Sequence, residues 1–218
     1  MTGDEALSAN PYWDIVGPSV SDRDGRRVVD GGRPNGSARL AYAQTILQAA
    51  YAYAIPSPET LSWIAEQCAG MPIVELGAGR GYWAALLAKE GLEVDAYDSE
   101  PPDVTANISF PAAAGKDPDA WHPVGDLKSF DARIEGADHA LFLCWPPGWG
   151  DSMASQALLG YERLGGSRLI FIGELKGGKT GDDAFFDLLT SQWKMESQDL
   201  QHVSWWNLRD VAQCWVRR

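Results

Sequence analysis

Residues 73–81 constrain the fold more than any other stretch of this chain. They read Ile-Val-Glu-Leu-Gly-Ala-Gly-Arg-Gly, a short apolar run that holds one acid, Glu75, and ends in alternating glycines. A helical pattern follows directly, and a second apolar run then ends in Asp98. A strand, a glycine-rich turn, a helix and a strand with an acid at its tip are typical of a nucleoside site at the carboxyl edge of a parallel sheet.

The spacing of the glycines indicates which kind of nucleoside is bound. The dinucleotide fingerprint G-x-G-x-x-G places its third glycine three positions after the second, where this chain has Tyr82. The third glycine comes one position earlier, at Gly81. The pattern G-x-G-x-G, with Glu75 two residues before it, resembles motif I of the class I S-adenosylmethionine-dependent methyltransferases. An ordinary strand-to-helix turn that binds no ligand is the alternative.

The resemblance implies S-adenosyl-L-methionine as the cofactor. The glycines would let the backbone approach the ligand, and the following helix N-terminus would suit the methionine carboxylate. Asp98 would accept hydrogen bonds from the ribose hydroxyls, and Asp126, after the third strand, would contact the adenine amino group. A turn Asp that caps a helix is the alternative for Asp126. The expected cofactor residues are Glu75, Gly77, Ala78, Gly79, Gly81, Trp83, Asp98, Ser99, Gly125, Asp126, Leu127 and Cys144.

The fourth expected strand ends in Cys144-Trp145-Pro146-Pro147-Gly148-Trp149. This turn is similar to the Asp/Asn-Pro-Pro-aromatic motif of amino-methylating members of the family, but Trp145 replaces the acid or amide and Gly148 replaces the aromatic residue. Two prolines still fix two φ angles. Trp145 and Trp149 can stack on a planar substrate or face a sulfonium, or simply pack under a loop.

We expect Trp145, Pro146 and Glu174 to form the catalytic part of the site. Glu174, His122 and His202 are the candidate bases, although a carboxylate acceptor would need none. Magnesium-dependent members of the fold carry an Asp where this chain has Trp145, so no metal is expected.

The segment that follows the fifth expected strand offers a rival function. Gly173, Gly178, Lys179 and Thr180 satisfy the bare P-loop pattern G-x-x-x-x-G-K-T after a strand. Two features oppose it. A P-loop belongs to the first strand of its unit, and the acids Asp182 and Asp183 would stand at the helix start where phosphates should bind.

Composition narrows the class of partner. The 218 residues suit one domain with a sizeable core. A formal charge of −12 argues against nucleic acid as a substrate, whereas 10 tryptophans suit an aromatic pocket for a flat organic molecule. Three scattered cysteines, no secretory signal and no long apolar run predict a cytoplasmic protein without a membrane partner. The oligomeric state is left open.

The hydrophobic pattern predicts a Rossmann-like α/β fold, a seven-stranded, mostly parallel sheet with an antiparallel last strand and helices on both faces. Residues 1–36 are expected to form a partly flexible surface segment with an anchor at 12–16, and residues 37–218 the methyltransferase domain. Strands are expected at 72–76, 94–98, 121–126, 141–145, 167–173, 193–200 and 210–217, and helices at 37–53, 57–64, 82–90, 153–161 and 182–192.

These observations predict an enzyme that transfers a methyl group from S-adenosyl-L-methionine to O or N of a small molecule or modified peptide. Three alternatives stay open. The Pro-Pro turn could serve a protein N-methyltransferase, the glycine-lysine segment could bind a nucleotide, or the chain could bind the cofactor without transferring a methyl group.

Overall fold

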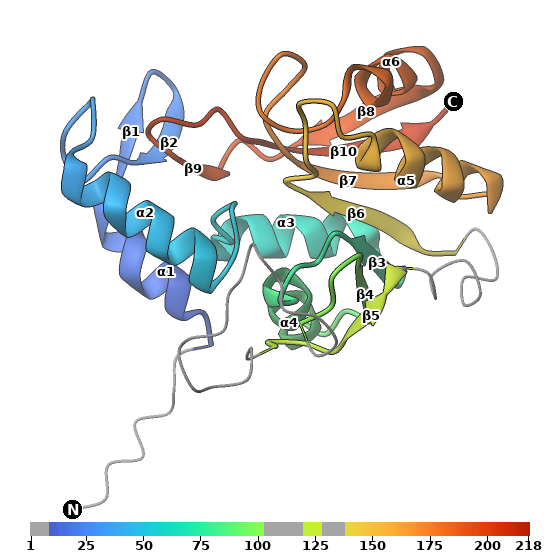
Figure 1. The fold of residues 1–218 in the computed structure, drawn as a ribbon, viewed down its shortest axis with the longest axis horizontal. Coiled ribbons are helices and arrows are strands. Elements are labelled where there is room, and N and C mark those ends of the chain that lie inside the picture. The colour runs from blue at the N-terminus through green and yellow to red at the C-terminus, as the bar shows by residue number, and fades with distance from the viewer. Residues whose placement is uncertain (1–8, 103–119, 128–137) are drawn as a thin grey trace, which may run out of the picture.

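The computed structural model describes residues 9–102, 120–127 and 138–218, and its main feature is a seven-stranded sheet in the order β5-β4-β3-β6-β7-β10-β8 (Figure 1). Strands β5, β4, β3, β6 and β7 run parallel, and β10 is antiparallel to both of its neighbours. The fold class predicted from the sequence is confirmed. The strands are β3 (Ile73–Leu76), β4 (Val94–Asp98), β5 (Val124–Asp126), β6 (Ala140–Cys144), β7 (Arg168–Gly173), β8 (Trp193–Gln198) and β10 (Val211–Arg217).

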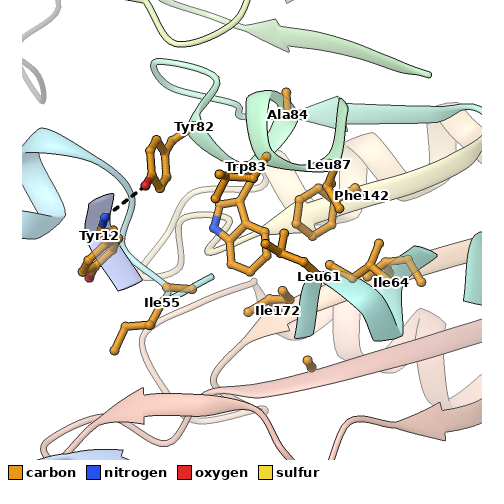
Figure 2. Packing of buried hydrophobic residues seen from close by; sticks show 14 of the residues in the cluster. Tyr12, Ile55, Leu61, Ile64, Tyr82, Trp83, Ala84, Leu87, Phe142 and Ile172 are labelled. Carbon is orange, nitrogen blue, oxygen red and sulfur yellow. Dashed lines mark hydrogen bonds between the residues drawn. The ribbon is translucent and has the colours of Figure 1, made fainter. Parts of the chain in front are cut away.

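Helices cover both faces of this sheet, which explains why its central strands are apolar without alternation. On one face Ile73 of β3 packs into a core with α3 and α4, and on the other Val74 packs with α5 and α6. Figure 2 shows the first of these cores around Trp83. The covering helices are α3 (Pro58–Cys68), α4 (Tyr82–Lys89), α5 (Met153–Arg163) and α6 (Asp183–Gln192).

The last strand occupies an interior position. β10 inserts between β7 and β8, so β8 and not the last strand forms the edge of the sheet. The sequence predicts an antiparallel hairpin at this edge, and the structure agrees, with Gln213 of β10 opposite Gln198 of β8.

The N-terminal segment is more integrated than the sequence predicts. Residues 11–29 form α1 (Pro11–Val16), the short 3₁₀ helix η1 (Gly17–Ser19), and a hairpin of β1 (Val20–Arg23) and β2 (Arg26–Val29). β2 pairs in parallel with β9 (Val203–Trp205), a strand that the sequence analysis missed, so a small second sheet joins the two ends of the chain (Figure 1). The expected anchor lies in α1, where Tyr12 is fully buried. The division of the chain at residue 36 stays a prediction.

Helix α2 (Ala38–Ala50) begins as expected, because the Ser37 hydroxyl accepts a hydrogen bond from the backbone N–H of Leu40. Its buried face is not the purely apolar one that the leucines, isoleucine and alanines of the helix would suggest. Gln44 and Leu47 are the buried residues of α2, whereas Ile46 is 49% exposed. The helix therefore turns a partly polar face inward, and the next subsection shows what that face lines.

Candidate functional site

One cavity of about 1170 Å³ opens at the carboxyl ends of β3, β4 and β6. Eleven of the residues expected from the sequence line it, and they come from four separate segments. The eleven are Glu75, Gly77, Ala78, Gly79, Trp83, Asp98, Ser99, Leu127, Cys144, Trp145 and Pro146. The cavity exceeds the range of roughly 300–1,000 Å³ typical of single small-molecule sites, so it has room for more than one ligand.

The glycine-rich turn lies between β3 and α4, and its backbone takes conformations that favour glycine. Gly77, Gly79 and Gly81 all have positive φ angles, of 79°, 56° and 73°. The backbone N–H of Gly79 donates to Asp98 Oδ2 at 2.8 Å. The N–H of Glu100 donates to Oδ1 of the same carboxylate at 2.9 Å. Asp98 thus ties the turn to the end of β4, and both its oxygens remain at the cavity wall.

Glu75 is the most unusual group in the cavity wall. Its side chain is 2% exposed, and its Oε2 atom has no hydrogen-bond partner among the residues that the structure describes. Burial raises the pKa of Glu75 to about 8, the backbone N–H of Ala84 in α4 lowers it, and nearby Asp98 raises it. One side of the carboxyl group therefore caps the N-terminal turn of α4. The other oxygen, Oε2, has no protein partner among the described residues, so a ligand or a water molecule in the cavity would have to bond to it.

Trp83 closes the floor of the cavity behind Glu75. Its indole ring is 2% exposed and meets Phe142 edge to face, with 5.6 Å between the ring centroids (Figure 2). The indole N–H has no partner among the described residues. Trp83 thus presents a mainly apolar surface to whatever occupies this half of the cavity.

Three expected cofactor residues do not line the cavity. Gly81 is the N-cap of α4 and packs against His122, to whose Cβ atom an added Cβ would come within 2.9 Å. Gly125 and Asp126 end β5, and Asp126 pairs in register with Asp98. Neither lines the cavity, whereas the following residue, Leu127, does. The direct adenine contact expected of Asp126 is not part of this geometry.

The turn after β6 is held in strained backbone conformations. Trp145 and Trp149 have φ angles of 54° and 52°, a left-handed region that bulky residues rarely adopt. Trp145 stacks on Tyr53 with 5.3 Å between ring centroids and 10° between planes. Trp149 is 83% exposed at the cavity wall. Strain of this kind persists where the surrounding structure imposes it, often at functional sites.

Asp210 lies behind Trp145 and is itself nearly inaccessible. The carboxyl group is 6% exposed, and neither of its oxygens has a hydrogen-bond partner among the described residues. Burial raises the pKa of Asp210 to about 7, and the nearby Trp145 indole N–H lowers it. That N–H also lacks a bond of acceptable geometry. The two groups lie close together without a well-formed hydrogen bond, and burial favours the neutral form of Asp210.

Glu174, expected among the catalytic residues, does not line the cavity. Its Oε2 accepts from the backbone N–H of Lys179 at 2.9 Å, and its Oε1 accepts from the N–H of Arg209 at 2.9 Å. A carboxylate that two backbone donors hold in this way anchors two loops to each other. Its geometry does not suit a base that must reach a substrate.

The same contacts argue against the P-loop hypothesis. In a P-loop, backbone N–H groups cradle phosphate oxygens, but here the Lys179 N–H is bound to Glu174. The Thr180 hydroxyl donates to the Glu174 carbonyl, and Thr180 forms an isolated bridge with Pro147. The segment is thus folded against the Pro-Pro turn, and its backbone donors serve the protein. Lys179 is nonetheless among the residues that line the cavity.

The two histidines proposed as bases also lie outside the cavity. A ring nitrogen of His122 is 3.1 Å from the Val94 carbonyl oxygen. His202 is buried in a network with Thr60 and Asp199, where burial, followed by the charges of Arg26 and Arg27, lowers its pKa to about 3. Neither imidazole reaches the cavity wall.

Several residues that line the cavity were not expected from the sequence, because they lie in segments without a recognisable sequence motif. They are Gln44, Gln48, Tyr51 and Tyr53 from α2 and the segment after it, Met153 from α5, and Asn207 and Leu208 from the loop before β10. The spacing of Gln44 and Gln48 by four residues in an otherwise apolar helix is the one local signal. No local signal identifies Asn207 and Leu208, because their position at the cavity depends on how β9 and β10 pack in the folded protein.

The described residues hold no group of three or more His, Cys, Asp or Glu side chains arranged to bind a metal ion. Within the same ranges, no helix combines the length and apolarity that crossing a bilayer requires.

Comparison with known proteins finds similarity only among solved structures. No family model matches the chain, and no curated protein matches it. A TehB-like SAM-dependent methyltransferase from Corynebacterium glutamicum aligns with 85% of this chain and 100% of its own, at 18% identity and a TM-score of 0.47. The CcbJ methyltransferase from Streptomyces caelestis aligns with 75% of this chain and 91% of its own, at 14% identity and a TM-score of 0.44.

A third structure is a 1,6-didemethyltoxoflavin-N1-methyltransferase from Burkholderia thailandensis with its substrate and S-adenosylhomocysteine bound. It aligns with 73% of this chain and 78% of its own, at 17% identity and a TM-score of 0.43. All three structures are less than 20% identical to this chain and align with it at TM-scores below 0.5.

Proposed function

We propose that this protein is an S-adenosyl-L-methionine-dependent methyltransferase that acts on O or N of a small molecule. One observation carries the proposal. A single cavity presents the unpartnered, buried oxygen of Glu75, the glycine turn and the Asp98 carboxylate from the ends of two adjacent parallel strands. A ligand that fits would place a cationic group beside Glu75 and hydroxyl donors beside Asp98. The part of it between these groups would lie against the backbone of the glycine turn.

S-adenosyl-L-methionine fits these requirements residue by residue. Its ammonium group would supply the partner that Glu75 Oε2 lacks, and its ribose hydroxyls would donate to Asp98. Trp83 and Leu127 would give apolar surfaces to the remainder. The bound cofactor supplies an activated methyl group on a sulfonium. The task of the protein is then to bind both ligands, exclude water and align the acceptor with that methyl group, which can provide much of the acceleration.

Trp145 and Pro146 lie where the acceptor half of the cavity begins. Among the expected catalytic residues they are the two that line it. The strained turn fixes their position, and the Tyr53 ring supports the indole of Trp145 from one side. We assign to them the role of positioning the acceptor. Modified peptides and proteins remain open as larger acceptors, because the cavity wall includes exposed Trp149.

Calorimetric titration with adenosylmethionine, adenosylhomocysteine and ATP tests the proposal. Asp98→Asn keeps the size of the side chain but loses its charge, and it should weaken binding of adenosylmethionine by about tenfold or more, as loss of hydrogen bonds to a charged group does. Asp95→Asn is the matched control, since Asp95 lies on the same strand, is exposed and does not line the cavity.

Three results would contradict the proposal. Binding of ATP alone would favour a nucleotide-binding protein instead. If Asp98→Asn and Asp95→Asn changed the affinity for adenosylmethionine equally, Asp98 would not contact the ligand. Tight binding of adenosylmethionine without methyl transfer to any small-molecule extract would favour a cofactor-binding protein that is not an enzyme.

A further inference from the structure

The acceptor half of the cavity has its own composition, distinct from the cofactor half. Its wall includes one face of α2, the Tyr53 and Trp145 ring pair, exposed Trp149, and three residues from the loops after β7 and β9. The residues that α2 contributes are Ala41, Gln44, Thr45 and Gln48, which share a face at helical spacing. Rings and amides therefore dominate this half, and planar molecules suit such walls.

Lys179 is the one basic side chain among the described residues that line the cavity. No carboxylate in the described ranges lies within ion-pair distance of its ammonium group, although the loop neighbour Lys176 pairs with Asp187. In a protein with a formal charge of −12, an unpaired lysine at a cavity wall is a specific feature. It marks a place where an anion would be stabilised.

Gln44 is a second polar group without a partner. The residue is 6% exposed and lines the cavity, and its side chain makes no hydrogen bond within the described part of the chain. Gln48, one turn later, already donates to the Tyr53 carbonyl oxygen. The amide of Gln44 is not among the fully enclosed polar groups without a partner, so it is open to a ligand or to water in the cavity. Gln44 can donate two hydrogen bonds to an oxygen anion.

Among the described residues, the cavity wall offers the acceptor one carboxylate outside the cofactor half, exposed Asp151. No histidine lines it among the described residues, and Glu75 and Asp98 belong to the cofactor half. Burial raises the pKa of Tyr82 to about 12 and that of Cys144 well above its usual value. Asp151, at an exposed position, accepts from the Met153 N–H. An acceptor that must lose a proton during transfer would have exposed Asp151 as its one candidate base among the described residues that line this half.

We propose that the acceptor is a planar aromatic carboxylate, bound by Lys179 and Gln44 and methylated on a carboxylate oxygen. This inference rests on the proposed function and names its substrate class. A carboxylate is already ionised at neutral pH, so its methylation needs no base. A new bond forms between the carboxylate oxygen and the methyl carbon as the sulfur–carbon bond breaks. The electron pair of that bond stays on sulfur, and no proton moves.

Ligand binding measured in the presence of adenosylhomocysteine tests the substrate class directly. The probes are benzoate and 2-naphthoate, their neutral analogues benzamide and 2-naphthamide, and the non-planar cyclohexanecarboxylate. We expect each aromatic carboxylate to bind more tightly than its amide, by up to about fivefold, because Lys179 is exposed and an exposed ion pair contributes at most about 1 kcal/mol. Cyclohexanecarboxylate should bind more weakly than benzoate, because it cannot stack on the rings. With adenosylmethionine present, mass spectrometry should detect the methyl ester.

Two lysines of one loop provide matched variants. Lys179→Met should weaken binding of the aromatic carboxylates by up to about fivefold and leave the binding of their amides and of adenosylhomocysteine unaffected. Lys176→Met should change none of these affinities, because Lys176 pairs with Asp187 away from the cavity. Gln44→Leu should reduce carboxylate binding in a protein that still binds adenosylhomocysteine.

The outcomes separate this inference from the function on which it rests. Failure of adenosylhomocysteine to bind would overturn both. If it binds, but the carboxylates bind no better than the amides, or neither carboxylate binds at millimolar concentration, the substrate class is wrong and the proposed function stands. An unchanged carboxylate affinity in Lys179→Met would also overturn the assignment.

Discussion

At the scale of single residues, Glu75 has a structural task and, under the proposed function, a ligand-binding one. One side of its carboxyl group caps α4 through the Ala84 N–H, and Oε2 is left unpartnered beside the cavity. Burial raises its pKa to about 8, so the group is largely protonated at pH 7 in the free protein. An arriving ammonium group favours the ionised form. Binding of the cofactor is therefore coupled to the release of a proton.

This coupling makes a prediction about pH. Affinity for adenosylmethionine should rise from pH 6 to pH 8 and then level off, because the cost of ionising Glu75 disappears above its pKa. Titrations at pH 7 in phosphate and in Tris should give different apparent enthalpies, since the released proton is taken up by the buffer. In Glu75→Gln the buffer dependence should vanish. Equal enthalpies in both buffers for the wild-type protein would contradict the assignment.

Asp210 gives a second prediction at this scale, about stability. Its pKa in the folded protein is about 7, above the ordinary value of 3.8. A raised pKa means that the folded state binds the proton more tightly than the unfolded state does. The contribution to stability is complete below pH 4 and is lost as the pH rises to about 7.

Asp210→Asn should therefore raise the free energy of unfolding at pH 8, by at most about 4 kcal/mol at 1.36 kcal/mol per pKa unit. The difference from the wild type should shrink towards pH 4. Urea denaturation at pH 4, 6 and 8 measures it. A variant that is equally or less stable than the wild type at pH 8 would show that the Asp210 carboxylate is stabilised by groups other than those seen here.

At the scale of elements, the turn between β3 and α4 depends on two properties of glycine. Gly81 has a φ of 73°, and a Cβ atom added to it would lie 2.9 Å from the His122 Cβ. Gly91, directly after α4, has a φ of 90° but open space around the added atom. Substitution of Gly91 therefore tests backbone strain alone, whereas substitution of Gly81 tests backbone strain together with close packing.

Alanine at Gly91 should cost only the left-handed backbone penalty, roughly 1–2 kcal/mol. Alanine at Gly81 should cost that penalty and in addition the displacement of the segment that carries His122, so its midpoint in urea should be clearly lower than that of Gly91→Ala. It should also reduce cofactor affinity, because the turn moves. Equal stability of the two variants would mean that the segment around His122 shifts without cost.

At the scale of the whole molecule, the two ends of the chain form one structure. Tyr12 of α1 is fully buried, and its hydroxyl accepts the indole N–H of Trp205 in β9 at 3.1 Å. Its backbone N–H donates to the Tyr82 hydroxyl at 3.2 Å (Figure 2). Arg26 of β2 extends the link by donating to the Ser204 hydroxyl. The N-terminal segment should therefore unfold together with the sheet.

Tyr12→Phe should lower the free energy of unfolding by about 1–3 kcal/mol, because it leaves the buried Trp205 N–H unpaired. Tryptophan fluorescence and far-ultraviolet circular dichroism should report one shared transition. Tyr42→Phe is the control, since Tyr42 is 70% exposed on α2. A separate early transition for the N-terminal segment would support the flexible surface segment that the sequence predicts.

The sequence by itself determined the sheet and the cofactor half of the cavity. The residues of that half are neighbours in the chain or lie at the ends of consecutive strands, as Glu75 and Asp98 do, so hydrophobic period and glycine spacing predict them. The parallel order and the antiparallel last strand follow from the same pattern. Glycine spacing alone also placed Gly81 in the ligand site, although its role in the structure is to let the turn pass His122.

Only the tertiary structure decided the acceptor half. Gln44 and Tyr53 come from α2 and the segment after it, whereas Trp145 and Lys179 come from two segments much later in the chain. Tertiary contacts also placed Glu174 between two backbone donors, away from the acceptor, and left Lys179 as an unpaired cation at the cavity wall. Local patterns specify elements, whereas the environment of a side chain depends on which distant segments meet around it.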